Sequence, residues 1–156
     1  MEGNRLAMYY RKASIKDIDQ LIELRKKLLI EEGFCSDNNI DEELEQYFSL
    51  SITNREMVIW LALDAEYIIG TAGVCFFQYP PSFSNPTGKI AYITNVYTRE
   101  EYRNQGVATK LLDFILDEVK MEGCQVTRLH ASAQGRKLYE KKGFVDAEGF
   151  MKRKMS

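Results

Sequence analysis

The stretch from Tyr102 to Lys110 (YRNQGVATK) has the residue pattern with the clearest chemical meaning. It lies between a predicted strand and a predicted helix, with Gly106 at the bend and Ala108 in the first helical turn. Backbone N–H groups at a helix N-terminus lack intrahelical acceptors and lie at the positive end of the helix dipole. The pattern therefore predicts a pyrophosphate site. Taken alone, it is explained more simply by a turn at Gly106 and a solvated Arg103.

Two other phosphate-binding motifs are excluded. A P-loop needs the string G-x-x-x-x-G-K-[ST], which the sequence does not contain. A dinucleotide-binding fingerprint needs G-x-G-x-x-G after the first strand, and the chain lacks those glycines at that place.

A second string, residues 129–144 (LHASAQGRKLYEKKGF), follows about thirty residues later. R-x-x-G-x-A and L-Y-E-K-K-G-F together resemble the pyrophosphate loop and the closing helix and strand of the GNAT superfamily of N-acetyltransferases. Either motif alone is weak, but the two in this order are fairly specific. The resemblance covers essentially the whole chain. It implies acetyl-CoA as co-substrate and a primary amine of a small molecule or peptide as acceptor.

The resemblance also assigns roles to individual residues. Ser132 falls where many family members have an asparagine that holds the pantetheine arm, and Tyr139 matches the tyrosine that acts as general acid. The expected cofactor-binding residues are Val96, Tyr97 and Thr98 at a strand end, Arg103, Asn104, Gln105, Gly106, Val107, Ala108 and Thr109 in the loop, and Ser132.

The chemistry of acetyl transfer fits these roles. Attack of an amine on a thioester needs donors aimed at the developing oxyanion. The departing thiolate needs a proton, which a phenol with a pKa near 10 can supply at neutral pH. Outside its motif, Tyr139 would be interpreted as a core tyrosine. Direct transfer in a ternary complex is favoured over a covalent route through Cys75 or Cys124, since apolar packing explains both thiols.

The general base stays open. Some family members that acetylate protein N-termini have a glutamate on the fifth strand, where Thr127 falls in this sequence. Glu32, Glu66 and His130 remain as candidates.

The acceptor channel is expected from the first two helices and the Tyr79–Gly88 loop. Aromatic residues that could line it are Phe34, Tyr47, Phe48, Tyr79 and Phe83, and acids that could attract a cation are Glu31, Glu32 and Glu43. The same residues could equally be ordinary core and a solvated acidic face.

These residues must be positioned by a fold that the hydrophobic patterns predict. Strands are expected at 5–13, 57–63, 67–77, 89–98 and 125–132, with a terminal strand pair within 144–155. Helices are expected from Ser14 to Gly33, at 41–48, at 107–122 and at 134–142. Ser14 and Asp17 resemble a capping box, and the apolar stripe of the first helix is Ile18, Leu21, Ile22, Leu24, Arg25 and Leu28. The fold class is α/β (α+β): a mixed, mostly antiparallel sheet of about six to seven strands flanked by four helices.

Length and composition restrict the remaining function classes. The 156 residues predict a single domain, 1–156. A net charge of −2 argues against nucleic-acid binding, and the sequence has no apolar run long enough to span a membrane. Three separated cysteines and one histidine predict no metal site and a reduced, cytoplasmic protein. Homodimer formation stays open.

Two alternatives to the acetyltransferase interpretation remain. One is a non-catalytic acyl-CoA-binding sensor or interaction module on the same fold, favoured by Thr127 and by Ser132 in place of asparagine. The other keeps the chemistry and changes the donor to a longer acyl-CoA.

Overall fold

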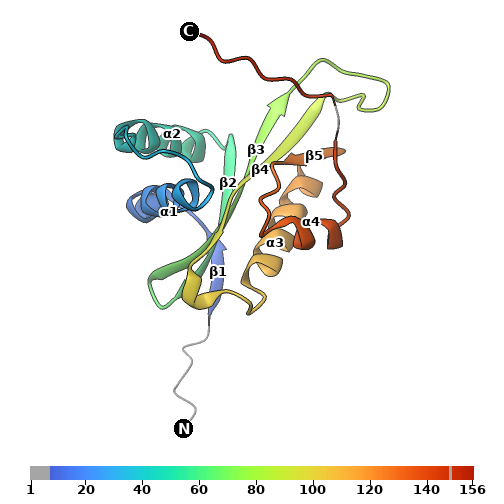
Figure 1. The fold of residues 1–156 in the computed structure, drawn as a ribbon. Helices are drawn as coiled ribbons and strands as arrows, with labels where there is room; N and C mark the ends of the chain where they lie inside the picture. Colours follow the sequence, from blue (N-terminus) through green and yellow to red (C-terminus); the bar gives the residue numbers. More distant parts are fainter. Residues whose placement is uncertain (1–7, 148) are drawn as a thin grey trace.

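The computed structural model describes residues 8–147 and 149–156, and Figure 1 shows them as one mixed sheet between two pairs of helices. The strands are β1 (Tyr9–Lys12), β2 (Met57–Asp64), β3 (Tyr67–Gln78), β4 (Lys89–Thr98) and β5 (Val126–Leu129). They lie in the order β1-β2-β3-β4-β5, antiparallel up to β4, and β5 pairs with β4 in parallel.

Helices cover both faces of this sheet. Helices α1 (Ile18–Glu31) and α2 (Asp41–Thr53) lie on one side, and α3 (Val107–Met121) and α4 (Arg136–Lys141) lie on the other (Figure 1). Short 3₁₀ turns at Ile15–Asp17 and Glu100–Tyr102 precede α1 and α3. Because each face of the sheet is covered, β2 and β3 are buried on both sides, as their nearly continuous apolar sequences require.

Two core clusters result, one on each face. The first packs α1 and α2 on the sheet, with Leu21, Leu24 and Phe48 almost fully buried. The second packs α3 and α4 on the other face, with Leu111, Leu112 and Ile115 at its centre. The buried leucines of α1 follow the stripe seen in the sequence.

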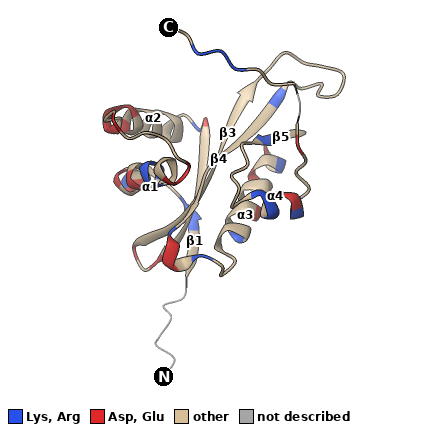
Figure 2. Cartoon of the chain, viewed as in Figure 1, with Lys and Arg blue, Asp and Glu red and all other residues tan. Residues whose placement is uncertain are grey.

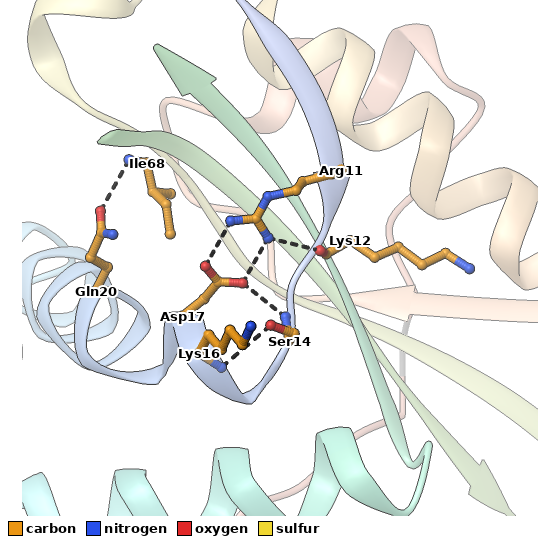
Figure 3. Close-up of polar contacts among 7 residues, drawn as sticks. All are labelled: Arg11, Lys12, Ser14, Lys16, Asp17, Gln20 and Ile68. Carbon is orange, nitrogen blue, oxygen red and sulfur yellow. Dashed lines mark hydrogen bonds and ion pairs between the residues drawn. The ribbon is translucent and has the colours of Figure 1, made fainter. Parts of the chain in front are cut away.

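Polar contacts fix where α1 begins. Asp17 accepts two hydrogen bonds from the Arg11 guanidinium, both 2.8 Å, and one from the Ser14 backbone N–H at 2.8 Å (Figure 3). Ser14 Oγ accepts from the Lys16 N–H at 3.3 Å, which completes the expected capping box. Gln20 Oε1 accepts from the Ile68 N–H at 3.1 Å. The first turn of α1 is thereby bound to β1 and β3.

The parallel pair β4–β5 diverges part-way along. Pairing covers only Ile90–Ile93 against Val126–Leu129, and β4 then continues to Thr98. A register shift against β3 lies at Asn95, which has a left-handed φ of 55°. Thr71 Oγ1 donates a 2.7 Å hydrogen bond to the Asn95 carbonyl and supports this bulge. The sheet therefore opens beside residues 94–98 of β4.

The predicted architecture is confirmed, with corrections at the ends. The mixed sheet and four helices are present, but the described residues form five strands, because the expected terminal pair at 144–155 is absent from them. Val145 is 87% and Met151 99% exposed, so this segment has no buried face to hold a strand in register. The first strand is shorter than expected, and its residues 5–7 lie outside the described part. Helix α2 extends five residues past its expected end at Phe48, to Thr53.

None of the helices in the described part of the chain is both long and apolar enough to cross a lipid bilayer.

Candidate functional site

Two adjoining cavities lie beside β4, the first at the point where β4 and β5 diverge and the second between β4 and the helices α1 and α2. We call the first, of about 190 Å³, the splay cavity. It is lined by Arg25, Leu28, Leu29, Glu32 and Phe34 from α1 and the segment after it, by residues 92–96 of β4, and by His130, Ser132 and Tyr139. We call the second, of about 540 Å³, the helix-side cavity. It is lined by Arg25, Ile40, Glu43, Leu44, Tyr47, Phe48, Met57, Cys75, Phe77, Tyr92, Thr94 and Asn95. Four residues line both cavities, which therefore adjoin one another: Arg25, Tyr92, Thr94 and Asn95.

The loop before α3 presents unsatisfied backbone donors. Asn104 and Gly106 have left-handed φ values of 62° and 79°, and no side chain caps the helix. The N–H groups of residues 104–109 donate to no acceptor among the described residues, and the first helical bond is from Lys110 N to Gly106 O at 3.1 Å. A Cβ on Gly106 would meet no heavy atom within 4 Å. The geometry is that of an anion site at a helix N-terminus.

The end of β4 combines a free edge with a buried side. Of the three residues expected to contact pantetheine, Val96 lines the splay cavity. Tyr97 and Thr98 are buried, and their side chains lie outside the lining of either cavity. Because β5 stops pairing at Ile93, backbone groups of β4 beyond that point face no strand on this edge within the described residues. An extended ligand can hydrogen-bond to such an edge as an added strand does.

Arg103 fastens the loop to α1. Its Nη2 donates to both carboxylate oxygens of Glu31, at 2.9 and 2.8 Å, and its Nε donates to the Thr98 carbonyl at 2.8 Å. The Tyr97 hydroxyl also donates to Glu31, at 3.4 Å. Glu31, expected as an attractor for the acceptor cation, is therefore already paired.

Tyr139 lines the splay cavity. It is 6% exposed, and burial, with a contribution from the negative charge of Glu32, raises the pKa of its phenol to about 12. Its hydroxyl bonds to no residue that the structure describes. Gly135 makes room for the ring, since a Cβ there would lie 2.7 Å from Tyr139 Cε2. The phenol is thus held protonated in the lining of the splay cavity.

Ser132 lines the same cavity, but its polar groups take part in starting α4. Its Oγ accepts from the Gly135 N–H at 3.0 Å, and its carbonyl accepts from the Arg136 N–H at 3.1 Å. The hydroxyl proton remains free for a ligand acceptor.

The structure separates the base candidates. Glu32 and His130 line the splay cavity, and the His130 ring contacts Tyr92 edge-on with centroids 5.9 Å apart. Glu66 lies in the turn between β2 and β3 and lines neither cavity. Thr127, on β5, also lies outside both linings.

The thiols are poorly suited to nucleophilic attack. Cys75 is buried, lies 3.2 Å from the Tyr47 hydroxyl, and has a pKa raised chiefly by burial. Burial likewise raises the pKa of Cys124. Because the thiolate is the nucleophile, both shifts argue against a covalent route.

The aromatic residues expected at the acceptor channel divide into two groups. Phe34 lines the splay cavity, and Tyr47 and Phe48 line the helix-side cavity. Tyr79 and Phe83 line neither, and Phe83 is fully exposed. Their loop closes on itself, with a 2.8 Å bond from Tyr79 N to Gly88 O, and it lies beyond the β3–β4 ends (Figure 1).

Among the cavity residues to which sequence reasoning gave no functional role are three polar ones, Arg25, Tyr92 and Asn95. Arg25 gave a signal, because it is a charged residue inside the apolar stripe of α1. Nothing in the sequence indicated Asn95, because the bulge at this residue depends on the pairing of β4 with β3.

Comparison with known proteins now decides the family. A model of the acetyltransferase (GNAT) domain matches residues 55–146, more than half of the chain. The chain belongs to the GNAT acetyltransferase family. An uncharacterized N-acetyltransferase, YhfO, of Bacillus subtilis is 29% identical over 111 residues, covering 69% of this chain and 71% of that protein. A putative acetyltransferase of the same organism is 28% identical over 139 residues, covering 88% and 84%.

Solved structures agree with the GNAT fold. The crystal structure of a predicted acetyltransferase with acetyl-CoA from Clostridium acetobutylicum has a TM-score of 0.92 and 40% identity, covering 95% of this chain and 96% of that one. A GCN5-related N-acetyltransferase from Ralstonia eutropha has a TM-score of 0.87 at 21% identity, covering 94% and 98%, and shows the fold alone. The family expected from the sequence motifs is confirmed.

Proposed function

We propose that this GNAT protein transfers an acetyl group from acetyl-CoA to a primary amine, by direct transfer in a ternary complex. The observation that carries the proposal is the Tyr139 hydroxyl. It belongs to a buried, protonated phenol without a partner among the described residues, in the lining of the cavity where β4 loses its neighbouring strand. The acetyl-CoA-bound relative from Clostridium acetobutylicum supports the choice of donor.

The cofactor would occupy the opening between β4 and β5. Its pantetheine amides would pair with the free edge of β4 at 96–98, and its pyrophosphate would accept hydrogen bonds from the N–H groups of residues 104–109. The left-handed conformation of Gly106 and the open space beside it let a phosphate approach the backbone. Arg103 would keep the loop in place through Glu31 rather than contact the phosphates.

The reaction then needs one acid and one base. The neutral amine attacks the thioester carbonyl carbon, the new C–N bond forms, and the C–S bond breaks as the tetrahedral oxyanion collapses. Tyr139 donates its proton to the departing thiolate. The proton lost by the amine goes to Glu32 or His130, the two candidate bases that line the splay cavity.

The rival function is a non-catalytic acyl-CoA sensor on the same fold. One observation favours it: the Ser132 hydroxyl, expected at the pantetheine arm, already accepts from the Gly135 N–H, which leaves only its proton for a contact with the cofactor. The unpartnered Tyr139 hydroxyl opposes it, because a sensor has no use for a proton donor at the thioester.

Thiol release tests the proposal. Purified protein would be mixed with acetyl-CoA and a panel of primary amines, including small aliphatic and aromatic amines, amino acids and peptides. Free CoA would be measured with a thiol reagent. We expect amine-dependent release with acetyl-CoA and slower release with longer acyl-CoAs. Binding of acetyl-CoA without release for any amine would favour the sensor instead.

A further inference from the structure

Arg25 is a cation without a counterion at the junction of the two cavities. It projects from α1 and lines both of them, and its Nη1 donates a 2.9 Å hydrogen bond to Asn95 Oδ1. Arg25 forms no ion pair with any residue in the described ranges. By contrast, Arg99 and Arg103, which also reach α1, pair with Glu23 and Glu31.

Among the described residues, no carboxylate lies within ion-pair distance of Arg25. Strands β2, β3 and β4 carry charge only at Asp64 and Lys89, which lie at strand ends (Figure 2). Two carboxylates line the cavities, Glu32 in the splay cavity and Glu43 in the helix-side cavity, and neither forms an ion pair with Arg25. One hydrogen bond to an amide leaves four guanidinium N–H donors for a ligand. A planar donor set of this kind matches a carboxylate.

The helix-side cavity beside Arg25 is mostly apolar. Its walls include Leu44, Phe48, Met57 and Phe77, and its volume is about 540 Å³. A large aliphatic or aromatic side chain can enter such a space with favourable burial of its surface.

We propose that the acceptor is a free α-amino acid with a large apolar side chain, an inference that rests on the proposed acetyl transfer. Its carboxylate pairs with Arg25, its side chain fills the helix-side cavity, and its α-amine enters the splay cavity beside Glu32 and Tyr139. An α-amino acid carries carboxylate, amine and side chain on one carbon. A carboxylate held at the junction therefore sends the other two groups into the two cavities.

The first test compares substrates that differ by one group. L-phenylalanine is compared with three other amines. Phenethylamine lacks the carboxylate, L-phenylalaninamide has a neutral amide in place of the charged carboxylate, and L-alanine lacks the ring. We expect kcat/KM from thiol release to be at least roughly tenfold higher for L-phenylalanine than for each of the other three, the size of a charge-assisted hydrogen bond or a filled apolar pocket.

Variants then assign the preference to Arg25. Arg25→Gln should lower kcat/KM for L-phenylalanine by roughly tenfold or more and leave that for phenethylamine within about threefold. Arg25→Lys keeps the charge and should restore part of the preference. Lys27→Gln removes a cation from the same helix outside both cavities and should change neither value. Equal use of L-phenylalanine and phenethylamine by the wild type would overturn the proposal while leaving acetyl transfer intact.

A binding measurement separates failure of this inference from failure of the proposed function. 3-Phenylpropionate carries the carboxylate and the ring but has no amine, so its binding does not depend on turnover. Calorimetric titration should show binding to the wild type and a loss of at least roughly tenfold in Arg25→Gln. If no amine releases thiol, the enzymatic proposal fails, and this titration alone decides whether Arg25 holds a carboxylate. Absence of binding to the wild type would overturn the carboxylate site.

Discussion

At the scale of single residues, the general acid that we propose is a phenol kept neutral by its surroundings. Burial raises the pKa of Tyr139 to about 12, so the proton that the proposed mechanism gives to the thiolate stays in place throughout the neutral and mildly alkaline range. The same burial fixes the ring, because Phe144 packs on it edge-on with ring centroids 6.0 Å apart and Gly135 lies directly against it.

Tyr139→Phe tests the proton donor. Phenylalanine keeps the ring and its packing and removes only the hydroxyl, so we expect kcat to fall by roughly 10²-fold or more, as for loss of a general acid. The dissociation constant of acetyl-CoA, measured by calorimetry, should stay within about threefold. A variant with unchanged kcat would remove Tyr139 from the mechanism.

Gly135→Ala tests the placement of the same ring without touching it chemically. Gly135 has a φ of −85°, which alanine adopts freely, but its Cβ would lie 2.7 Å from Tyr139 Cε2. The ring must shift, and we expect kcat to drop by roughly tenfold or more, since small misplacements of reacting groups are costly. Combining it with Tyr139→Phe should add little further loss. Full additivity of the two changes would contradict a shared cause.

At the scale of elements, the N-terminus of α3 is the predicted phosphate site. The glycines at the two ends of this helix provide a matched pair of positions for a test. Gly106 and Gly123 precede and follow the helix, have φ values of 79° and 73°, and each has open space where a Cβ would be. Alanine at either position should cost about 1–2 kcal/mol of stability through left-handed strain.

Of the two variants, only Gly106→Ala should weaken the binding of acetyl-CoA, by roughly tenfold. The added methyl group would occupy the space through which the pyrophosphate approaches the backbone. Calorimetric titration of both variants measures this, with thermal unfolding as the stability control. Equal affinities in the two variants would place the phosphates elsewhere.

The start of α1 gives a pH-dependent prediction at the same scale. Hydrogen bonds from Arg11, together with the Ser14 N–H, hold the pKa of Asp17 below its ordinary value despite burial. A lowered folded-state pKa stabilises the protein above the unfolded-state value, about 3.9, and this contribution is lost as pH falls through the folded-state pKa.

Asp17→Asn should therefore cost about 1–3 kcal/mol at pH 7, where the charged hydrogen bonds are fully formed. The difference from the wild type should begin to shrink below about pH 4, where Asp17 of the unfolded chain becomes protonated, and should be lost once the pH falls through the lowered folded-state pKa. Urea unfolding at pH 7 and pH 3 measures both values. A difference that is the same at the two pH values would contradict the assigned role of Asp17.

At the scale of the whole molecule, most elements could be predicted from local patterns. The apolar stripes of α1 and α3 and the uninterrupted apolar runs of β2 and β3 report directly which faces are buried. The capping box at Ser14 and Asp17 also follows from spacing alone. The two motifs that indicated the family lie on elements whose ends are marked by glycine, at Gly106 and Gly143.

The features that could not be predicted from the sequence depend on contacts between segments far apart in the chain. The bulge at Asn95 exists only because β4 is held by β3, and the cavity beside it exists because β5 pairs with only four residues of β4. The strands expected after Phe144 do not form, because no neighbouring segment buries one of their faces. Arg25 shows both what the sequence reveals and what it does not. Its charge is conspicuous within an apolar stripe, but its position between two cavities appears only in the folded chain.

Calorimetric titration of acetyl-CoA into the purified protein, with ATP as the control ligand, tests the central claim most directly. ATP offers phosphates without a pantetheine arm, so a site built from the β4 edge and the α3 N-terminus together should distinguish the two. We predict saturable, one-to-one binding of acetyl-CoA and no measurable binding of ATP at the same concentrations. No binding of acetyl-CoA, or equal binding of both, would contradict the cofactor site described above.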